Sequence, residues 1–399
     1  MKIAIVHDIL DAYGGAERVV QAMLDAFPES DLFVSRFTNN PQIAHIRNRF
    51  SNSSTTNNIP RQISADGQTH DPQLAARNRL STTFMQHLPF HKLLGKFYTP
   101  FYPLAFESLD LTEYDVIISS TAHFAKGVLT TPEQLHVCYC HTPPRFLYHY
   151  PTESNARNSL ILKPFVYMLD HSLRIYDRIA AQRPDFFLVN SEVVHDRVKK
   201  FHGREAQVIY PPVDTERFRP KENVQKEDYF IFVGRILPYK NIDTVINAFN
   251  KLPDRLLVVG EGGAKDAAMA LAKDNDKIEF LGFVKEDRLI SLLQKARGFI
   301  FSPSDEDFGI TAVEAQAAGT AVIALSDGGA QETVVEGVTG VFYDVNSVDD
   351  LLRAVDKFKE KEREFNSDTI INHAARFSKE RFIREVTSFV EKKSSKLNV

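Results

Sequence analysis

Short apolar runs alternate along the chain with longer stretches in which apolar residues recur every three or four positions. Runs that are apolar throughout are typical of strands buried on both faces of a parallel sheet, and the stretches between them predict covering helices. Strands are expected at 3–7, 31–35, 115–119, 136–140, 186–190, 229–233, 255–259, 278–280, 298–301, 321–324 and 341–343. Helices are expected at 16–27, 241–251, 286–296, 309–318 and 348–360. The pattern predicts an α/β protein with doubly wound sheets.

The pattern stops once, between Ile209 and Tyr229, in a stretch that contains three prolines and a run of charged residues. Such a linker divides the chain into two Rossmann-like domains, which leaves a cleft beyond the carboxyl ends of the strands. The predicted domains are 1–210 and 211–375, and a C-terminal helix at 376–399 is expected to pack back on the first domain.

Composition narrows the class of protein. The 399 residues include 48 Lys and Arg against 52 Asp and Glu, a net charge of −4, so nothing draws the chain as a whole to nucleic acid. No apolar run approaches the roughly 20 residues of a membrane span, and the first residues read as a buried strand rather than a signal peptide. Cys138 and Cys140 lie two apart, on one face of a predicted strand, which favours buried thiols in a reducing, cytoplasmic setting.

The segment 78–106 is basic and rich in aromatic residues, and it contains no acid. Such a segment suits the surface of an anionic membrane. The alternative is that Phe84, Phe90, Phe97 and Phe101 fill the core of the first domain.

Two carboxylates, Glu306 and Glu314, stand eight residues apart around a glycine that opens a predicted helix. The amides of Gly309 and Ile310 would lie at the helix N-terminus, which favours an anion. Carboxylates beside that anion could accept hydrogen bonds from sugar hydroxyls. The alternative is simple capping, because acids near a helix start are favourable in any case.

A second candidate segment ends a strand at Gly234 and then places Arg235 and Lys240 on a loop before a helix. A guanidinium and an ammonium together suit a diphosphate, although a solvated basic loop would look the same. Gly260 and the Gly282-Phe283 pair also follow strands. The third glycine of the dinucleotide fingerprint is missing after Gly260-Glu261-Gly262.

Taken together and in this order, these segments resemble the donor-binding half of the retaining GT-B glycosyltransferases of family 4 (GT4). The matching segments are 233–240, 306–314, Gly-Gly-Ala-Gln-Glu-Thr-Val at 328–334 and Gly-Val-Thr-Gly at 337–340. The first half agrees at 14–18, 139–145, 189–191 and 210–214. His-Thr-Pro-Pro-Arg at 141–145 is most similar to the bacterial polysaccharide and O-antigen mannosyltransferases.

The resemblance implies a GT-B fold, with acceptor-side residues in the first domain and the nucleotide-sugar donor on the second. Glu314 would bind the ribose hydroxyls, Glu306 the transferred sugar, and Arg235 with Lys240 the diphosphate. His141 would donate to a sugar hydroxyl beside the reacting centre, unless it is only a strand-end histidine satisfied by the backbone. His141, Glu306, Arg235 and Lys240 form the expected catalytic group. The expected donor-binding residues also include Gly15, Gly234, Gly260, Phe283, Phe308, Gly309, Ile310 and Glu314.

The implied function is retaining transfer of a hexose, with mannose from GDP-mannose as the leading donor, to a lipid-linked or oligosaccharide acceptor in bacterial surface polysaccharide synthesis. Asp305-Glu306-Asp307 resembles a metal-binding Asp-x-Asp, but basic residues already face the phosphates, so no metal and no cofactor are expected. The expected location is cytoplasmic, with peripheral membrane contact through 78–106. The stretch 48–75 matches no motif of the acceptor side. The alternatives are a nucleotide-sugar epimerase on the same fold and a non-catalytic nucleotide-sugar binding component of an assembly complex.

Overall fold

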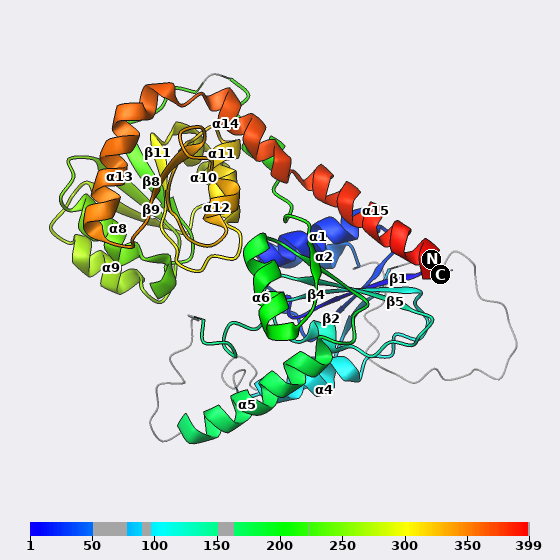
Figure 1. Ribbon diagram of the computed structural model, residues 1–399. Coiled ribbons are helices and arrows are strands. Elements are labelled where there is room, and N and C mark those ends of the chain that lie inside the picture. The colour runs from blue at the N-terminus through cyan, green and yellow to red at the C-terminus, as the bar shows by residue number, and fades with distance from the viewer. Residues whose placement is uncertain (51–77, 90–96, 151–162, 223, 398–399) are drawn as a thin grey trace, which may run out of the picture.

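The computed structural model describes residues 1–50, 78–89, 97–150, 163–222 and 224–397 (Figure 1). The chain forms two parallel sheets. The first has the order β3-β2-β1-β4-β5-β6-β7, with all neighbouring strands parallel. Its strands are β1 (Ile3–His7), β2 (Asp31–Val34), β3 (Leu80–Thr82), β4 (Val116–Thr121), β5 (Leu135–Cys140), β6 (Phe186–Val189) and β7 (Ala206–Val208).

The second sheet has the order β10-β9-β8-β11-β12-β13 and is also parallel throughout. Its strands are β8 (Tyr229–Val233), β9 (Arg255–Val259), β10 (Ile278–Gly282), β11 (Gly298–Phe301), β12 (Val322–Leu325) and β13 (Gly340–Tyr343). The predicted strands are confirmed. Strands β3 and β7 were not predicted, because three partly exposed residues such as Leu-Ser-Thr make no apolar run.

Helices cover both faces of the first sheet. Alternate residues of β1 face opposite ways: Ile5 packs in the cluster that holds α1 (Gly15–Ala26) and α15 (Lys379–Leu397), and Val6 packs with α4 (Tyr102–Glu107) and α5 (Lys163–Ala180). Helix α6 (Glu192–His202) packs against β5 and β6 on the same side as α5. The C-terminal helix α15 thus lies on α1 and buries Phe382 and Val386 there (Figure 1).

The second sheet is covered in the same way. Phe230 and Phe232 face the cluster that contains α8 (Ile242–Phe249), α9 (Lys265–Ala272) and α13 (Val348–Lys361). Tyr229 and Ile231 face α10 (Glu286–Lys295) and α11 (Ile310–Ala317). The remaining α-helices of the described residues are α2 (Ala44–Asn48), α7 (Thr215–Phe218), α12 (Ala330–Thr333) and α14 (Ser367–Ala374).

Three features of the sequence can be placed on this fold. Cys138 and Cys140 are free and buried, as predicted. Phe84, Phe97 and Phe101 are exposed and do not fill the core, whereas Phe90 lies outside the described residues, as does 51–75 of the stretch without a motif. None of the helices within the described ranges is long and apolar enough to cross a membrane.

Candidate functional site

The N-termini of α1 and α11 meet between the two sheets. A Cβ added at Gly15 would lie 2.9 Å from Cδ1 of Ile310, so the first turn of α1 lies against the first turn of α11. Gly309 opens α11 at φ +95°, and a Cβ there would also lie 2.8 Å from the ring of Phe301. The positive φ of Gly309 requires glycine, whereas a side chain at Gly15 would have to displace the end of the Ile310 side chain. The first-turn amides of a helix have no acceptor inside it, and two converging N-termini create a place for an anion.

Glu314 lies on α11, buried, with 1% of its surface exposed. Its Oε1 accepts a hydrogen bond from Nη1 of Arg18 on α1, in an ion pair between the two halves of the chain. The negative charge of Glu314 raises the pKa of Arg18 further above its ordinary value, against the effect of burial. A buried carboxylate needs such a partner, because an uncompensated charge in a core is strongly unfavourable.

Glu306 lies on the loop after β11 and pairs with Lys240, whose Nζ is 2.6 Å from Glu306 Oε2. The loop rests on two glycines. Gly329 donates its amide to the carbonyl of Glu306 at 2.9 Å, and a Cβ on Gly328 would lie 2.4 Å from the same oxygen. The Gly-Gly pair thus places the Glu306 backbone. Lys240, on the connection between β8 and α8, meets the Glu306 carboxylate there.

His141 directly follows β5 and belongs to a chain of buried hydrogen bonds. Its Nε2 is 2.8 Å from Oγ of Ser120, which lies 3.2 Å from Nδ1 of His7. The same Nδ1 is 3.0 Å from the carbonyl of Ser120, which can only accept, so Nδ1 of His7 carries a proton. The Ser120 hydroxyl thus lies between the two rings, within hydrogen-bond distance of both.

The surroundings of His141 affect the protonation state of its ring. Burial lowers the pKa of His141 to about 4, so the ring is neutral near pH 7. With the Ser120 hydroxyl proton directed at Nε2, a neutral His141 would carry its ring proton on Nδ1. Although burial lowers the pKa of His7, contacts with Glu17 and Asp8 outweigh it and raise that pKa above its usual value.

Asp307, an acidic residue of the second half, is bound by two arginines of the first half. Nη1 of Arg145 is 3.2 Å from Asp307 Oδ1, and Nη1 of Arg197 on α6 donates to the same oxygen. The Arg197 guanidinium lies over the ring of Tyr150 at 4.3 Å. Burial raises the pKa of Asp307, an effect that the two arginines oppose.

Arg145 retains donors for a ligand. Its Nε and Nη2 are buried and have no hydrogen-bond partner among the described residues. The guanidinium lies 5.1 Å from the ring centre of Tyr239, next to Lys240. An anion in the cleft would therefore meet cations from both halves of the chain.

A third contact between the halves involves Glu332 of α12. Its carboxylate oxygens accept hydrogen bonds from the amide of Glu192, both at 3.0 Å, and one also accepts from Val193 at 3.3 Å. A carboxylate from the second half therefore caps the N-terminus of α6 in the first. Burial raises the pKa of Glu332.

The other predicted site residues lie around this cleft in different ways. Arg235 is exposed directly after β8. A Cβ on Gly260 would lie 1.9 Å from the carbonyl of Gly234, so these two backbones require the close approach that glycine allows. Phe283, after β10, is 67% exposed, whereas the Phe308 side chain is buried against Tyr210 and Phe377. Only the backbone of Phe308 could contact a ligand.

The pairings across the cleft are what sequence reasoning missed. Arg18, Arg145 and Glu332 lie in the matching segments 14–18, 139–145 and 328–334, but the sequence assigned them no role. Arg197 and Ser120 carried no signal, because nothing in a local pattern says which residue a distant helix will face. In the Asp-x-Asp segment, the carboxylate of Glu306 contacts Lys240 and that of Asp307 contacts the two arginines. Within the ranges that the structure describes, no three His, Cys, Asp or Glu side chains form a metal-binding group.

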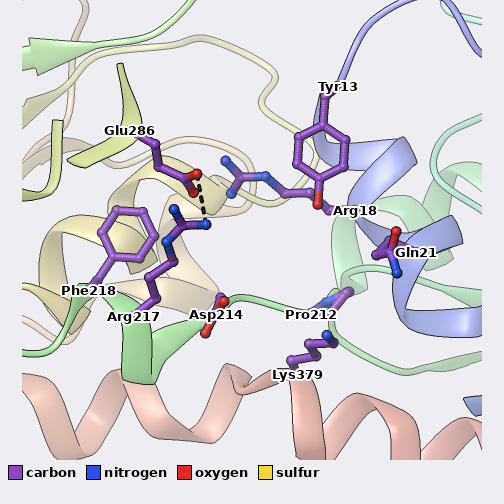
Figure 2. A pocket seen from close by; sticks show the side chains of 9 residues that line it. All are labelled: Tyr13, Arg18, Gln21, Pro212, Asp214, Arg217, Phe218, Glu286 and Lys379. Carbon is purple, nitrogen blue, oxygen red and sulfur yellow. Dashed lines mark ion pairs between the residues drawn. The ribbon is translucent and has the colours of Figure 1, made fainter. Parts of the chain in front are cut away.

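A pocket opens next to Arg18 (Figure 2). It lies between α1, the connection before β8 and the start of α15, and Lys379 and Asp214 flank it. Arg217 and Glu286 form an ion pair of 2.8 Å across it. The pocket reaches the Arg18 end of the Arg18–Glu314 pair.

The fold is an α/β architecture of two Rossmann-like halves, each built on a parallel sheet, with charged pairs between them. The sequence model of the family described as Glycosyltransferase Family 4 matches residues 13–217, just over half of the chain. The model described as Glycosyl transferases group 1 matches residues 214–379. The chain belongs to glycosyltransferase family 4.

Relatives and solved structures agree with this assignment. The chain is similar to the D-inositol 3-phosphate glycosyltransferases of Mycobacterium sp. (strain KMS) and Mycolicibacterium smegmatis, each 31% identical over 215 residues. These matches cover 49% of this chain and 49% and 50% of the two relatives, so the chain matches about half the length of each.

The fold is that of sucrose-phosphate synthase from Thermosynechococcus elongatus, with a TM-score of 0.68, 17% identity, and coverage of 99% of this chain and 100% of that one. It is also that of Anabaena HepE in complex with UDP and glucose, with a TM-score of 0.65, 17% identity, and coverage of 98% and 99%. The architecture is GT-B.

Proposed function

We propose that this protein transfers a hexose from a nucleotide diphosphate donor to a growing glycan, with retention of anomeric configuration. The observation that carries the proposal is the meeting of two helix N-termini, at Gly15 and Ile310, beside the Lys240–Glu306 pair. Amides and an ammonium suit a diphosphate, and a carboxylate beside them suits the hydroxyls of a sugar.

Each charged group has a role in this proposal. Glu314 binds the ribose hydroxyls, and Arg18 pairs with that carboxylate and fixes its position. Lys240 and Arg235 stabilise the negative charge that develops on the leaving diphosphate. Glu306 accepts hydrogen bonds from the transferred sugar, and its contact with Lys240 keeps its oxygens aimed into the cleft.

His141 contributes a hydrogen-bond donor rather than a base. Its pKa of about 4 and the bond from Ser120 to Nε2 leave a neutral ring with Nδ1–H, which donates to a sugar hydroxyl. Transfer by attack on the face from which the diphosphate leaves needs no nucleophile from the protein. No metal and no cofactor take part in the proposed reaction.

We propose GDP-mannose as the donor and a lipid-linked saccharide as the acceptor, in bacterial surface polysaccharide synthesis at the inner face of the plasma membrane. Support for the donor is the likeness of 141–145 to the mannosyltransferases. Support for the acceptor is the exposure of Phe97, Phe101 and Leu104 in the acid-free segment 78–106, which fits a membrane surface.

The test is thermal stabilisation of the purified protein by GDP, UDP and ADP, each alone and with its common sugars. A ligand at 100 times its dissociation constant adds roughly 2.7 kcal/mol to the free energy of unfolding, which gives a clear rise in Tm. We expect the rise with GDP and GDP-mannose, and we expect its loss in Glu314→Gln. Glu279→Gln, which neutralises an exposed carboxylate on β10, is the matched control and should keep the shift.

The outcomes separate the parts of the proposal. A shift with uridine nucleotides alone would retain the transferase and replace the donor. Sugar isomerisation without an acceptor would identify an epimerase, and tight binding without turnover a non-catalytic component. A folded protein that no nucleotide stabilises would overturn the donor site.

A further inference from the structure

The outward face of α5 is apolar although the helix lies on the surface. Phe165, Met168, Ile175 and Ile179 are 62%, 62%, 51% and 56% exposed. They follow one another at spacings of three, seven and four residues, which places them in one stripe along the helix. Tyr167 beside the stripe is exposed as well. An exposed apolar stripe of this length is rare on a surface that meets only water.

On α5, the acidic side chains are buried and the exposed charged side chains are basic. Both of its acids, Asp170 and Asp177, are buried on the inward face, and Asp177 contacts Lys126 at 2.5 Å and His202 at 2.8 Å. The exposed charged side chains of the helix, Lys163 and Arg178, are cationic. The outward face therefore combines an apolar stripe with positive charge and presents no acid.

We propose that α5 docks flat on an anionic lipid bilayer, with its apolar stripe between the headgroups. Amphipathic helices that lie in a membrane interface have this combination of an apolar face and basic flanks. The proposal deepens the function proposed above and rests on it for its purpose, delivery of a lipid-linked acceptor. The surface itself, however, can be tested without any turnover.

A second copy of the chain is the competing occupant. Spacings of three, four and seven residues are also typical of the contact face of paired helices. Two copies of α5 would, however, bring Lys163 and Arg178 of one chain near the same cations of the other, with no exposed acid on the helix to compensate them. Like charges in that arrangement are unfavourable, whereas a negatively charged surface attracts them.

The apolar surface continues beyond α5. In Figure 1, α5 lies next to α4, on the side of the first sheet away from α15. Both helices pack on one core cluster, which includes Phe106 and Leu173. Leu104 on α4 is 58% exposed, and Phe97, a few residues before α4, is 68% exposed. A flat lipid surface could contact both α4 and α5, whereas the α5 helix of a second copy would contact only one of them.

The inward face of α5 connects this surface to the cleft. Nη1 of Arg174 donates to the carbonyl of Leu147 at 3.0 Å, and Tyr148 donates to Asp177 at 2.8 Å. The loop so fixed also carries Arg145, which reaches the carbonyl of Asp305 in the donor half at 3.0 Å. A docked α5 would thus hold one wall of the cleft against the membrane.

The test is flotation of the full chain with lipid vesicles. Vesicles of phosphatidylcholine alone are compared with vesicles in which one third of the lipid is phosphatidylglycerol, at low and high salt. We expect binding to the anionic vesicles and its weakening by salt. The triple variant Phe165→Ser, Met168→Ser, Ile175→Ser should bind about 100-fold more weakly, because three partly inserted apolar side chains are lost. Met269→Ser with Leu271→Ser, on the exposed part of α9, is the matched control and should bind like the wild type.

Two measurements keep the result decisive. The nucleotide-induced rise in Tm shows that the triple variant is folded, and it reports on the donor site independently of the lipid surface. Undiminished flotation of a folded triple variant, or absence of binding to anionic vesicles by the wild type, would refute the proposal. A dimer in solution that the triple substitution splits would assign the stripe to a second copy and would equally overturn it.

Discussion

At the scale of single residues, the hydroxyl of Ser120 has more influence on the site than its exposure suggests. It lies between two buried histidines, 2.8 Å from Nε2 of His141 and 3.2 Å from Nδ1 of His7. In the proposed site the hydroxyl proton points to Nε2 of His141. One serine would then set which nitrogen of His141 can donate into the cleft.

Removal of the Ser120 hydroxyl should allow His141 to adopt either neutral tautomer. In Ser120→Ala, Nε2 of His141 loses its donor, and part of the population should move the proton from Nδ1 to Nε2. We expect a fall in kcat of about tenfold, the worth of one hydrogen bond, with KM little changed. The measurement is the pair of imidazole ¹⁵N chemical shifts of His141, combined with kinetics.

A neighbouring residue provides the control. Ser119→Ala deletes the same group one position earlier, on the opposite face of β4, where Ser119 contacts His136 at 2.9 Å. It should leave the His141 signals and kcat unchanged. Unaltered ¹⁵N shifts of His141 in Ser120→Ala would contradict the assigned hydrogen-bond chain.

At the scale of elements, the first turns of α1 and α11 approach closely where Gly15 faces the side chain of Ile310. Gly15→Val would place new atoms against Ile310, where even a Cβ lies 2.9 Å from Cδ1. We expect the helix starts to separate and donor binding to weaken roughly tenfold, since overpacking of this kind costs about 1–3 kcal/mol. The nucleotide-induced shift in Tm measures the effect.

A second substitution should restore donor binding in Gly15→Val. Ile310→Ala removes the clashing atoms, so the double variant should recover most of the shift, which is a coupling between residues in contact. Gly14→Ala is the control, because its Cβ would meet only the flexible end of Glu17 at 3.1 Å. If the double variant binds donor no better than Gly15→Val alone, the two helix starts do not form one site.

At the scale of the whole molecule, buried histidines make the fold sensitive to acid. Burial lowers the pKa of His136 to about 3 and that of His141 to about 4, against an ordinary value of 6.5. Between pH 6.5 and pH 4 these two rings are therefore protonated in the unfolded chain but stay neutral in the folded protein. The free energy of unfolding consequently falls as the pH falls. His7, with its raised pKa, acts in the opposite direction.

The contribution of His136 can be isolated. From pH 7 to pH 4 it should lower the free energy of unfolding by about 3 kcal/mol, so His136→Gln should lose that much less over the same range. Urea unfolding at both pH values measures the difference. His87→Gln, at an exposed position, should behave like the wild type. An equal loss in His136→Gln and wild type would mean that His136 is protonated in the folded state.

The sequence by itself determined the two sheets and the positions of the donor-side carboxylates. Apolar runs and helical periodicity are local properties, and a glycine before a helix marks its start wherever the helix goes. Glu306, Glu314 and Lys240 could therefore be assigned to loops and a helix start without any knowledge of the fold.

Only the tertiary structure decided which groups meet. Arg18 and Glu314 pair although they stand 296 positions apart, and Arg197 reaches Asp307 across 110. Such pairs depend on how two separately folded sheets pack, and periodicity contains no information on that. The apolar stripe of α5 is similar: a helical pattern shows that apolar residues share a face, but only packing shows that this face points outward.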